Sequence, residues 1–508
     1  MFDGALAGLG ALLDIKLLAM IFAATVAGVL IGALPGLGAT SGAALLLPFT
    51  VTMPPVQAIA ILATLYCAAT YAGSITAILI NTPGTSAAAA TCIDGYPLAQ
   101  RGEAGRALGM ATVASTIGGI FSVIVLAFSA PLLAKLAYQF GPPEYFALSL
   151  FGLSMLASIS AGGAVKNLIG GVFGVLLATI GIDKMSSVER FTFGSPELAE
   201  GIHFIPVLIG LFALSELLVQ STMLNQTVER IAMKAVQLPS WEDYRRTWRT
   251  ILRSCGIGTF IGVLPAEGAT VASMIGYNEA RRWSKNKDEF GKGAIEGIAG
   301  AEAANNAATG GAMVPTLALG IPGSATTAII LAAMLVHGIR PGPALFTQQA
   351  AFVWAIFGAM LIANVMFFGL GLVGAKLFAR VTLIPNTYLW PGVFLVCVVG
   401  AYALDQSMED VWIMLVFGLI GYAMRRLGFS VVPVAIGLIL GELVETTLRQ
   451  SLVMFDNQWW KMFTRPITLV FFVLTALGLA SPLIFGWLEG RWRGEEPGKR
   501  RAEGPLSE

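Results

Sequence analysis

Small polar residues follow glycine and proline breaks at four places in a very apolar chain, and together they could bind an anion. The residues concerned are Gly36, Gly38, Thr40 and Ser41; Asn81, Thr82, Gly84, Thr85 and Ser86; Gly268 and Thr270; and Gly323, Ser324 and Thr326. Each stretch predicts a new helix start, where hydroxyl groups cap free N–H groups. Helix N-termini attract anions because they carry partial positive charge and free donors. We therefore predict that the four starts meet and bind a carboxylate, the alternative for any single residue being tight helix packing.

Ionisable and amide side chains form a second candidate group, made of Glu267, Glu302, Asn305 and Asn306. Such groups within an apolar bundle are costly unless they are paired or functional. Glutamate and asparagine oxygens suit a hard cation or a proton, so we predict that these residues handle a coupling ion, Na⁺ or H⁺. A helix cap or an interhelical hydrogen bond is the alternative for the two glutamates. Asp94, in contrast, belongs to a Gly-Tyr-Pro stretch that we interpret as a solvated turn.

Other site chemistries find little support in the sequence. The cysteines lie in or beside apolar segments without disulfide or metal spacing: Cys67, Cys92, Cys255 and Cys397. The two histidines, His203 and His337, are too isolated to indicate a metal site. No Walker sequence is present, and a net charge of +1 gives no reason to expect an acidic partner such as nucleic acid. We expect no catalytic residues, no cofactor and no bound metal.

The composition indicates a polytopic membrane protein. Hydrophobic residues make up 56% of the 508 residues, charged residues only 12%, and the mean hydropathy is +0.76. Charge-free runs such as Ala107 to Ala134, Leu345 to Ala375 and Ile467 to Leu488 are long enough to cross a bilayer as helices. The N-terminus has no basic segment, so the first apolar run is expected to be a retained helix and not a cleaved signal peptide.

A peptide with two Gly/Pro breaks occurs twice, at Ile31 to Thr40 and at Ile261 to Thr270. Three weaker pairs follow in the same order. They match Thr82 to Ala87 with Ile321 to Thr326, Pro142 to Tyr145 with Pro385 to Tyr388, and Ile205 to Leu211 plus Glu216 with Val432 to Leu438 plus Glu442. Chance similarity in apolar sequence is the alternative, but an ordered series of matches indicates two homologous halves.

The repeats and the charges together predict the domain organisation. We expect a first membrane repeat at 1–228, a cytoplasmic interfacial connector at 229–252, a second membrane repeat at 253–447, an external segment with a final transmembrane helix at 448–488, and a basic cytoplasmic tail at 489–508. The connector and the tail are both basic, which indicates the cytoplasm. One apolar span separates the tail from the end of the second repeat. The two repeats should therefore have opposite orientations in the membrane.

Basic residues flank the second copy of the repeated peptide on both sides, at Arg253 and at Arg281 to Lys287. The residues between them suffice for one full crossing, yet both flanks look cytoplasmic. A re-entrant hairpin that turns at Leu264 to Gly268 resolves this conflict, because two arms of about a dozen residues reach about 18 Å, roughly the bilayer midplane. The alternative is one helix kinked at Pro265 and followed by a basic external loop.

Several of these stretches, taken together, resemble a known transporter family. They are Gly32 to Gly38, Asn81 to Gly84 with Asp94 to Pro97, Phe290 to Gly297, Glu302 to Asn306 and Leu319 to Gly323. From about Leu17 to Gly486 the chain looks like the large membrane subunit of the tripartite tricarboxylate transporters. It departs from that pattern at Ala266-Glu267, where the family more often has Gly and a small or apolar residue, and at Ala301, where Pro is expected. These departures concern the substrate and the coupling ion, not the fold.

The resemblance implies a cation-coupled secondary transporter, a symporter, in the bacterial inner membrane. Its substrate would be a carboxylate, either a tricarboxylate such as citrate or a related dicarboxylate or aromatic carboxylate. A periplasmic solute-binding protein would deliver this substrate, and a small four-helix membrane subunit would accompany the chain. The implied fold is all-α, with inverted repeats, broken helices and an elevator-like core that moves past a scaffold.

Two rival functions remain open from the sequence. A membrane channel would need rings of charge or carbonyl filters, whereas the motifs here occur only in pairs. An intramembrane enzyme would need a nucleophile beside a base, and His337 lies well downstream of Ser324.

Overall fold

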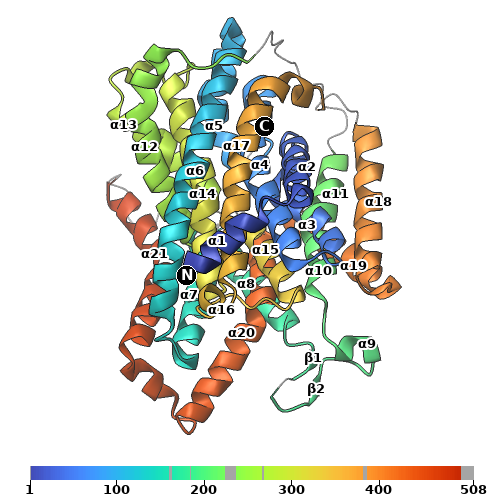
Figure 1. Ribbon diagram of the computed structural model, residues 1–508. Helices are drawn as coiled ribbons and strands as arrows, with labels where there is room; N and C mark the ends of the chain where they lie inside the picture. The colour runs from blue at the N-terminus through green and yellow to red at the C-terminus, as the bar shows by residue number, and fades with distance from the viewer. Residues whose placement is uncertain are drawn as a thin grey trace, which may run out of the picture.

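The computed structural model describes residues 2–159, 163–183, 185–222, 236–265, 268–381 and 386–492. Within these residues the protein is almost entirely helical, as predicted, and Figure 1 shows most of the long helices running side by side. The exception is a two-stranded antiparallel sheet in which β1 (Gly181–Ile182) pairs with β2 (Glu189–Arg190). Glu267 and the predicted basic tail beyond Trp492 lie outside the described residues.

The elements before the connector are α1 (Phe2–Ala11), α2 (Ile15–Gly32), α3 (Gly38–Thr50), α4 (Pro55–Ile80), the 3₁₀ turn η1 (Ser86–Ala88), α5 (Ala89–Leu98), the π-helical turn η2 (Ala99–Glu103), α6 (Ala104–Ala137), α7 (Pro142–Ile159), α8 (Ala164–Leu177), β1, β2, α9 (Pro196–Ala199), α10 (Phe204–Leu208), the π-helical η3 (Ile209–Leu214) and α11 (Ser215–Ser221).

The elements after it are α12 (Trp241–Val263), α13 (Gly268–Trp283), the 3₁₀ turn η4 (Lys287–Glu289), α14 (Ile295–Leu319), α15 (Ala325–Val336), α16 (Leu345–Gln348), α17 (Ala350–Val381), α18 (Asn386–Asp405), α19 (Met408–Arg426), α20 (Val432–Met454), the 3₁₀ turn η5 (Trp459–Thr464) and α21 (Pro466–Trp492).

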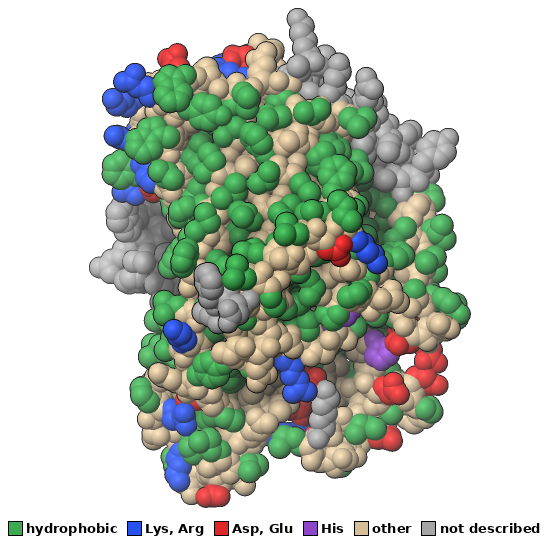
Figure 2. Space-filling view, viewed as in Figure 1, with side chains coloured by type: hydrophobic (Ala, Val, Ile, Leu, Met, Phe, Trp, Pro, Cys, Tyr) green, Lys and Arg blue, Asp and Glu red, His purple; other side chains and the backbone are tan. Residues whose placement is uncertain are grey.

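Long apolar helices give the molecule the character of a multi-pass membrane protein. Two of the three charge-free runs found in the sequence fall within α6 and α21, and the third, Leu345 to Ala375, covers α16 and most of α17. By length and composition, five helical segments of the described chain are suited to crossing a membrane: Ile15–Gly32, Pro55–Ile80, Ser86–Ala137, Phe204–Ser221 and Ala350–Gly374. Figure 2 shows hydrophobic side chains over much of the visible face, with Lys and Arg gathered at the edge formed by α12 and α13 and again toward the opposite end.

Helices in equivalent positions of the two halves cross at equivalent glycines. A methyl group added at Gly32 of α2 would lie 2.3 Å from the Ala69 carbonyl oxygen of α4. One added at Gly262 of α12 would lie 2.5 Å from the Ala308 carbonyl oxygen of α14. Both contacts require a residue without a side chain, because real Cβ atoms do not approach so closely. The repeated peptide therefore ends a helix that packs tightly in the same way in each half.

The halves also exchange contacts. Helix α4 packs against α17 while its counterpart α14 packs against α6, and α8 packs against α20 while η3 packs against α19. Each half thus supplies helices that cover the other, and residues distant in the sequence meet at the centre of the molecule.

Helices α12 and α13 form a hairpin, as Figure 1 shows at the upper left. The Arg253 guanidinium carbon lies 5.2 Å from the ring centroid of Trp283, near the far end of α13. Arg246 forms an ion pair with Glu289 at 2.5 Å, just beyond that end. The chain therefore turns back on itself after Val263, and the kinked single crossing does not hold. The arms are longer than expected, because α12 already begins at Trp241, so the predicted boundary at 252/253 falls inside one helix.

The hairpin predicts a short distance between labels at its open end. Spin labels on Arg253→Cys and Trp283→Cys, in a variant without the native cysteines, should lie within about 20 Å of each other. A continuous helix would separate these positions by about 45 Å. Pulsed electron–electron double resonance in lipid vesicles measures the distance between the labels, and a value near about 45 Å would refute the hairpin.

Asp94 is part of the helix framework and not a solvated turn, so that interpretation was wrong. Its carboxylate is fully buried and accepts hydrogen bonds from the backbone N–H groups of Gly293 (2.8 Å) and Ala294 (2.9 Å). Ala294 is the N-cap residue of α14 and has no side-chain acceptor of its own. Asp94 therefore ties α5 to the start of α14 by accepting from the two N–H groups that immediately precede the helix.

Candidate anion-binding site

The four predicted helix starts meet at one cavity of about 620 Å³. Its lining includes Gly36, Gly38, Thr40 and Ser41 from the start of α3, Gly84, Thr85 and Ser86 from the start of η1, Thr270 from α13, and Ser324 and Thr326 from α15. These segments come from both halves and are separated by long stretches of sequence. The convergence that the sequence predicted is thus present in the structure. We refer to this space as the hydroxyl cavity.

Four of the predicted residues do not line the hydroxyl cavity: Asn81, Thr82, Gly268 and Gly323. Asn81 ends α4 in a left-handed conformation with φ of 54°, and its side chain is exposed elsewhere. Gly323 packs against Ala312, where an added Cβ would lie 2.6 Å from the Ala312 Cα atom. The left-handed helix end therefore accounts for Asn81, and close helix packing accounts for Gly323.

Hydroxyl pairs join the two halves across the cavity. Thr40 and Thr326 form a hydrogen bond of 2.9 Å, and Ser86 and Thr270 form another of 2.9 Å. Thr40 follows the first break of the first half, and its partner Thr326 follows the second break of the second half. The other pair shows the reverse arrangement, because Ser86 follows the second break of the first half and Thr270 follows the first break of the second half. Tyr66 adds a third such contact, because its hydroxyl lies 3.3 Å from the Ser324 Oγ atom.

Side-chain capping differs among the helix starts. Ser324 caps α15 as predicted, since its Oγ atom accepts from the Thr327 N–H group at 3.2 Å in a capping box. The N-cap of α3 is Leu37, which has no acceptor, and Thr85 makes no cap bond to η1. Ser41 donates instead to the Phe212 carbonyl oxygen at 3.0 Å. First-turn N–H groups without a side-chain cap suit an anionic acceptor.

Several helix dipoles point at the hydroxyl cavity. Helices α3, α13, α15 and α20 have 13, 16, 12 and 23 residues, and the cavity is lined by residues from the first turn of each. The start of α20, with Ser430 to Val432, was not among the predicted site residues. Each N-terminus contributes roughly half a positive charge, so their fields add in the shared space. The site therefore favours a negatively charged group.

A cationic side chain also lines the cavity, and sequence reasoning missed it. Arg425, at the C-terminal end of α19, forms an ion pair of 2.6 Å with Glu216 and donates to the Ser215 Oγ atom at 3.1 Å. Both charged residues line the hydroxyl cavity. The sequence offered only a weak signal, the charge of Glu216 beside the fourth repeated peptide, and nothing in it named Arg425 as the partner. That pairing depends on the packing of α11 against α19, which no local pattern reveals.

The predicted coupling-ion residues of α14 are buried behind this cavity. Asn305 donates from Nδ2 to the carbonyl oxygen of Thr70 at 3.5 Å, and Thr70 lines the cavity. The Glu302 carboxylate is fully buried and accepts from Ser115 at 2.8 Å and from Thr91. Asn306 donates to the Glu302 carbonyl oxygen at 3.4 Å. Glu302, Asn305 and Asn306 thus lie together in one buried polar cluster on α14, whereas Glu267 is outside the described residues.

Two oxygens of this cluster lack partners among the described residues. They are the Oδ1 atoms of Asn305 and Asn306, both on fully or almost fully buried side chains. A buried carbonyl-type oxygen without a donor is costly unless something else satisfies it. Such oxygens are suitable ligands for a small hard cation.

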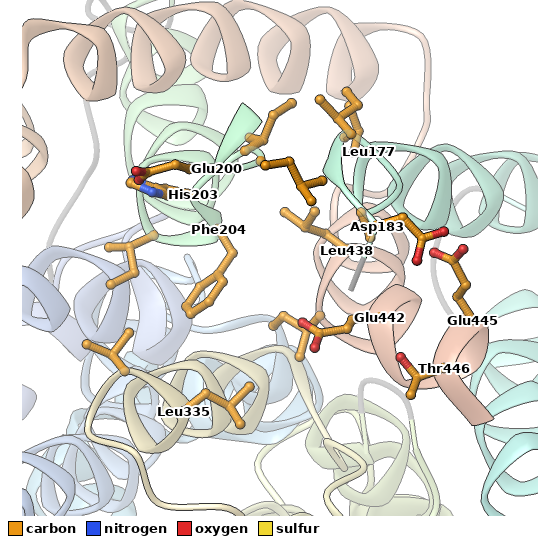
Figure 3. Close-up of a pocket in the computed structure, with 18 of the residues that line it drawn as sticks. Leu177, Asp183, Glu200, His203, Phe204, Leu335, Leu438, Glu442, Glu445 and Thr446 are labelled. Carbon is orange, nitrogen blue, oxygen red and sulfur yellow. The ribbon is translucent and has the colours of Figure 1, made fainter. Parts of the chain in front are cut away.

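A second cavity of about 500 Å³ lies toward the β1–β2 end of the molecule (Figure 3). Carboxylates outnumber guanidinium groups in its lining, which includes Asp183, Glu200, Asp405, Glu442 and Glu445 with Arg190 and Arg449. Hydrogen bonds from the Met185 and Ser186 N–H groups, assisted by Arg449, hold the pKa of the Asp183 carboxyl well below its usual range. This acidic cavity disfavours an anion, in contrast to the hydroxyl cavity.

The two cavities are lined by successive parts of the same helices. Helix α15 begins at the hydroxyl cavity with Thr326 and ends at the acidic cavity with Leu335, and α20 likewise runs from Val432 to Glu445. Helix α3 also connects the two spaces, because it begins at Gly38 in the hydroxyl cavity and its C-cap residue Val51 lines the acidic cavity. Along α15 and α20, the nearest lining residues are separated by six to nine positions, or about 9–14 Å. Buried apolar residues occupy the turns between them, among them Ile330 and Ile436.

Comparison with known proteins assigns the chain. Residues 18–436 match the model of the Tripartite tricarboxylate transporter TctA family. The chain belongs to this family. A relative from Agrobacterium vitis, named only as an uncharacterized 52.8 kDa protein in the TAR-I ttuC' 3'region, is 38% identical over 466 residues, or 91% of this chain and 92% of the relative.

A second Agrobacterium vitis relative, an uncharacterized protein in the TAR-II ttuC' 3'region, is 36% identical over 227 residues, or 45% of this chain and 93% of the relative. No solved structure matches this member of the family. The family match confirms the resemblance seen in the sequence and makes the chain one component of a tripartite transport system.

Proposed function

We propose that this chain is the transporting subunit of a cation-coupled importer of carboxylates, and that the hydroxyl cavity binds the substrate. The observation that carries the proposal is the convergence of α3, α13, α15 and α20 on one cavity that also contains Arg425. Helix N-termini, hydroxyls and one guanidinium form a site for carboxylate oxygens. Membership of the tricarboxylate transporter family supports the same substrate class.

The substrate would be a tricarboxylate such as citrate, or a related dicarboxylate or aromatic carboxylate. A site of about 620 Å³ is large enough for any of these. In this proposal a periplasmic binding protein delivers the substrate, and a small four-helix membrane subunit completes the system in the bacterial inner membrane. The family's tripartite character supports the need for partners.

Coupling to Na⁺ or H⁺ would involve the cluster of Glu302, Asn305 and Asn306. The hydrogen bond from Asn305 to the Thr70 carbonyl oxygen supports this, because it connects the cluster to the wall of the hydroxyl cavity. A cation bound there would offset the charge of a carboxylate substrate nearby. Glu267 belongs to the same proposal on the basis of the sequence.

Transport would proceed by alternating access with inverted repeats. The exchange of equivalent contacts between the halves supports a two-fold relationship. The hydroxyl cavity and the acidic cavity are separated by buried apolar helix turns, which supports alternating access to the centre of the molecule from two sides. An elevator-like movement of the hairpin-containing core is the form that the broken helices favour.

Carboxylate binding to the purified chain tests the proposed site. A panel of citrate, dicarboxylates and aromatic acids first identifies the carboxylate that binds most tightly. Thr40→Val removes a hydroxyl that lines the cavity, and we expect the affinity for this carboxylate to fall about fivefold, the effect of one neutral hydrogen bond. Isothermal titration calorimetry measures this affinity. Thr82→Val is the matched control, because its hydroxyl bonds to the Ile80 carbonyl oxygen outside the cavity. Equal losses in both variants would place the substrate elsewhere.

A further inference from the structure

Three potential metal ligands meet at the edge of the acidic cavity. The His203 Nδ1 atom lies 3.1 Å from Asp405 Oδ2 and 3.3 Å from Asp410 Oδ1, and the three ligand atoms all lie within 4.8 Å of one another. His203 is the N-cap residue of α10, whereas Asp405 ends α18 and Asp410 lies in the first turn of α19. Residues from both halves of the chain thus form the cluster.

The spacing of these atoms suits a metal ion. In a tetrahedral site with bonds of about 2.0–2.1 Å, neighbouring ligand atoms are about 3.3 Å apart. Both histidine–carboxylate distances already have this length. Only the two carboxylates must approach each other, and Asp405 is free to do so because its side chain is 59% exposed.

Asp410 provides an independent sign that the cluster is incomplete. Its side chain is only 4% exposed, yet its Oδ2 atom has no hydrogen-bond partner among the described residues. The imidazole can offer one Nδ1 proton to two carboxylates, which leaves their mutual repulsion largely uncompensated. A divalent cation bound by both carboxylate oxygens of Asp410, together with His203 and Asp405, would satisfy Oδ2 and neutralise both carboxylates.

We propose that His203, Asp405 and Asp410 form a binding site for a divalent transition-metal ion such as Zn²⁺. One imidazole nitrogen and two carboxylate oxygens match the preference of these ions for mixed N and O ligands. His203 and Asp405 line the acidic cavity, and Figure 3 shows His203 on its wall beside Glu200. Water completes the coordination from the cavity side. The ion joins α10 of the first half to the α18–α19 junction of the second half.

Cobalt substitution tests the site in the full-length chain. The purified protein is stripped with a chelator and titrated with Co²⁺, whose visible absorption reports inner-sphere coordination, and Zn²⁺ is then added as a competitor. We expect one Co²⁺ per chain. Loss of a ligand in His203→Ala or Asp410→Asn should weaken Co²⁺ binding by about 100-fold. Removing a residue that only hydrogen-bonds to a metal ligand already costs up to about this much affinity, so removing a ligand should cost no less.

The chain offers a matched control, because His337 is its other histidine. His337→Ala should bind Co²⁺ as the unmodified protein does. Asp405→Asn keeps the test valid if the buried variants fail to fold, since this exposed side chain can be changed without disturbing the core. If the unmodified protein shows no Co²⁺ absorption, or if Asp405→Asn and His203→Ala bind as tightly as it does, the three residues form only an ion-paired contact.

Discussion

Replacing Arg425 by Gln should weaken carboxylate binding by about 10- to 100-fold, the contribution of a hydrogen bond to a charged group. Arg425 contributes a guanidinium group to the hydroxyl cavity, and its side chain is 30% exposed. The substitution removes this positive charge. It also leaves Glu216 without its ion-pair partner, so a negative group then faces the incoming anion. Both effects act in the same direction, which makes this one of the largest losses that we expect.

Glu216→Gln separates the two effects. This change frees Arg425 from its partner at 2.6 Å while keeping the shape of the side chain. Affinity should therefore stay the same or rise, and the double variant should bind more tightly than Arg425→Gln alone. Titration calorimetry with the carboxylate chosen above measures all four proteins. If Glu216→Gln loses as much affinity as Arg425→Gln, the pair acts only as a link between α11 and α19.

Glu302→Gln should abolish uptake driven by an ion gradient while leaving substrate exchange in place. Glu302 accepts hydrogen bonds from Ser115 and Thr91 inside the polar cluster and does not line the hydroxyl cavity. The amide keeps one acceptor oxygen and the volume of the side chain but cannot ionise. Coupling to a proton or a cation therefore fails, whereas the helix starts that bind the carboxylate remain.

Reconstituted vesicles containing the partner subunits measure both activities. Uptake is followed under an imposed Na⁺ or H⁺ gradient, and exchange is followed with labelled substrate and no gradient. Ser115→Ala is the control, because it removes one hydrogen bond and leaves the carboxylate. We expect this control to keep coupled uptake at a reduced rate. Full coupling in Glu302→Gln would show that the carboxylate is structural, and Asn305 and Asn306 would then be the residues to test for the ion.

The sequence by itself determined the class of the molecule and its local breaks. Gly and Pro fix helix ends through backbone geometry, so the starts of α3, η1 and α15 follow from a few neighbouring residues. The charge pattern around Arg253 and Arg281 likewise favoured a return of the chain over a kinked crossing, and α12 and α13 form that hairpin. Repeated peptides then indicated that each feature occurs twice.

The tertiary structure decided which of these features meet. Asp94 looked like a surface turn because its partners, the N–H groups of Gly293 and Ala294, are about 200 residues away in the chain. Arg425 and the start of α20 join the hydroxyl cavity only through the packing of the second half onto the first. His203 looked isolated because its neighbours come from the distant α18–α19 junction. Local sequence encodes backbone geometry and charge, whereas these contacts depend on how the two halves fold against each other.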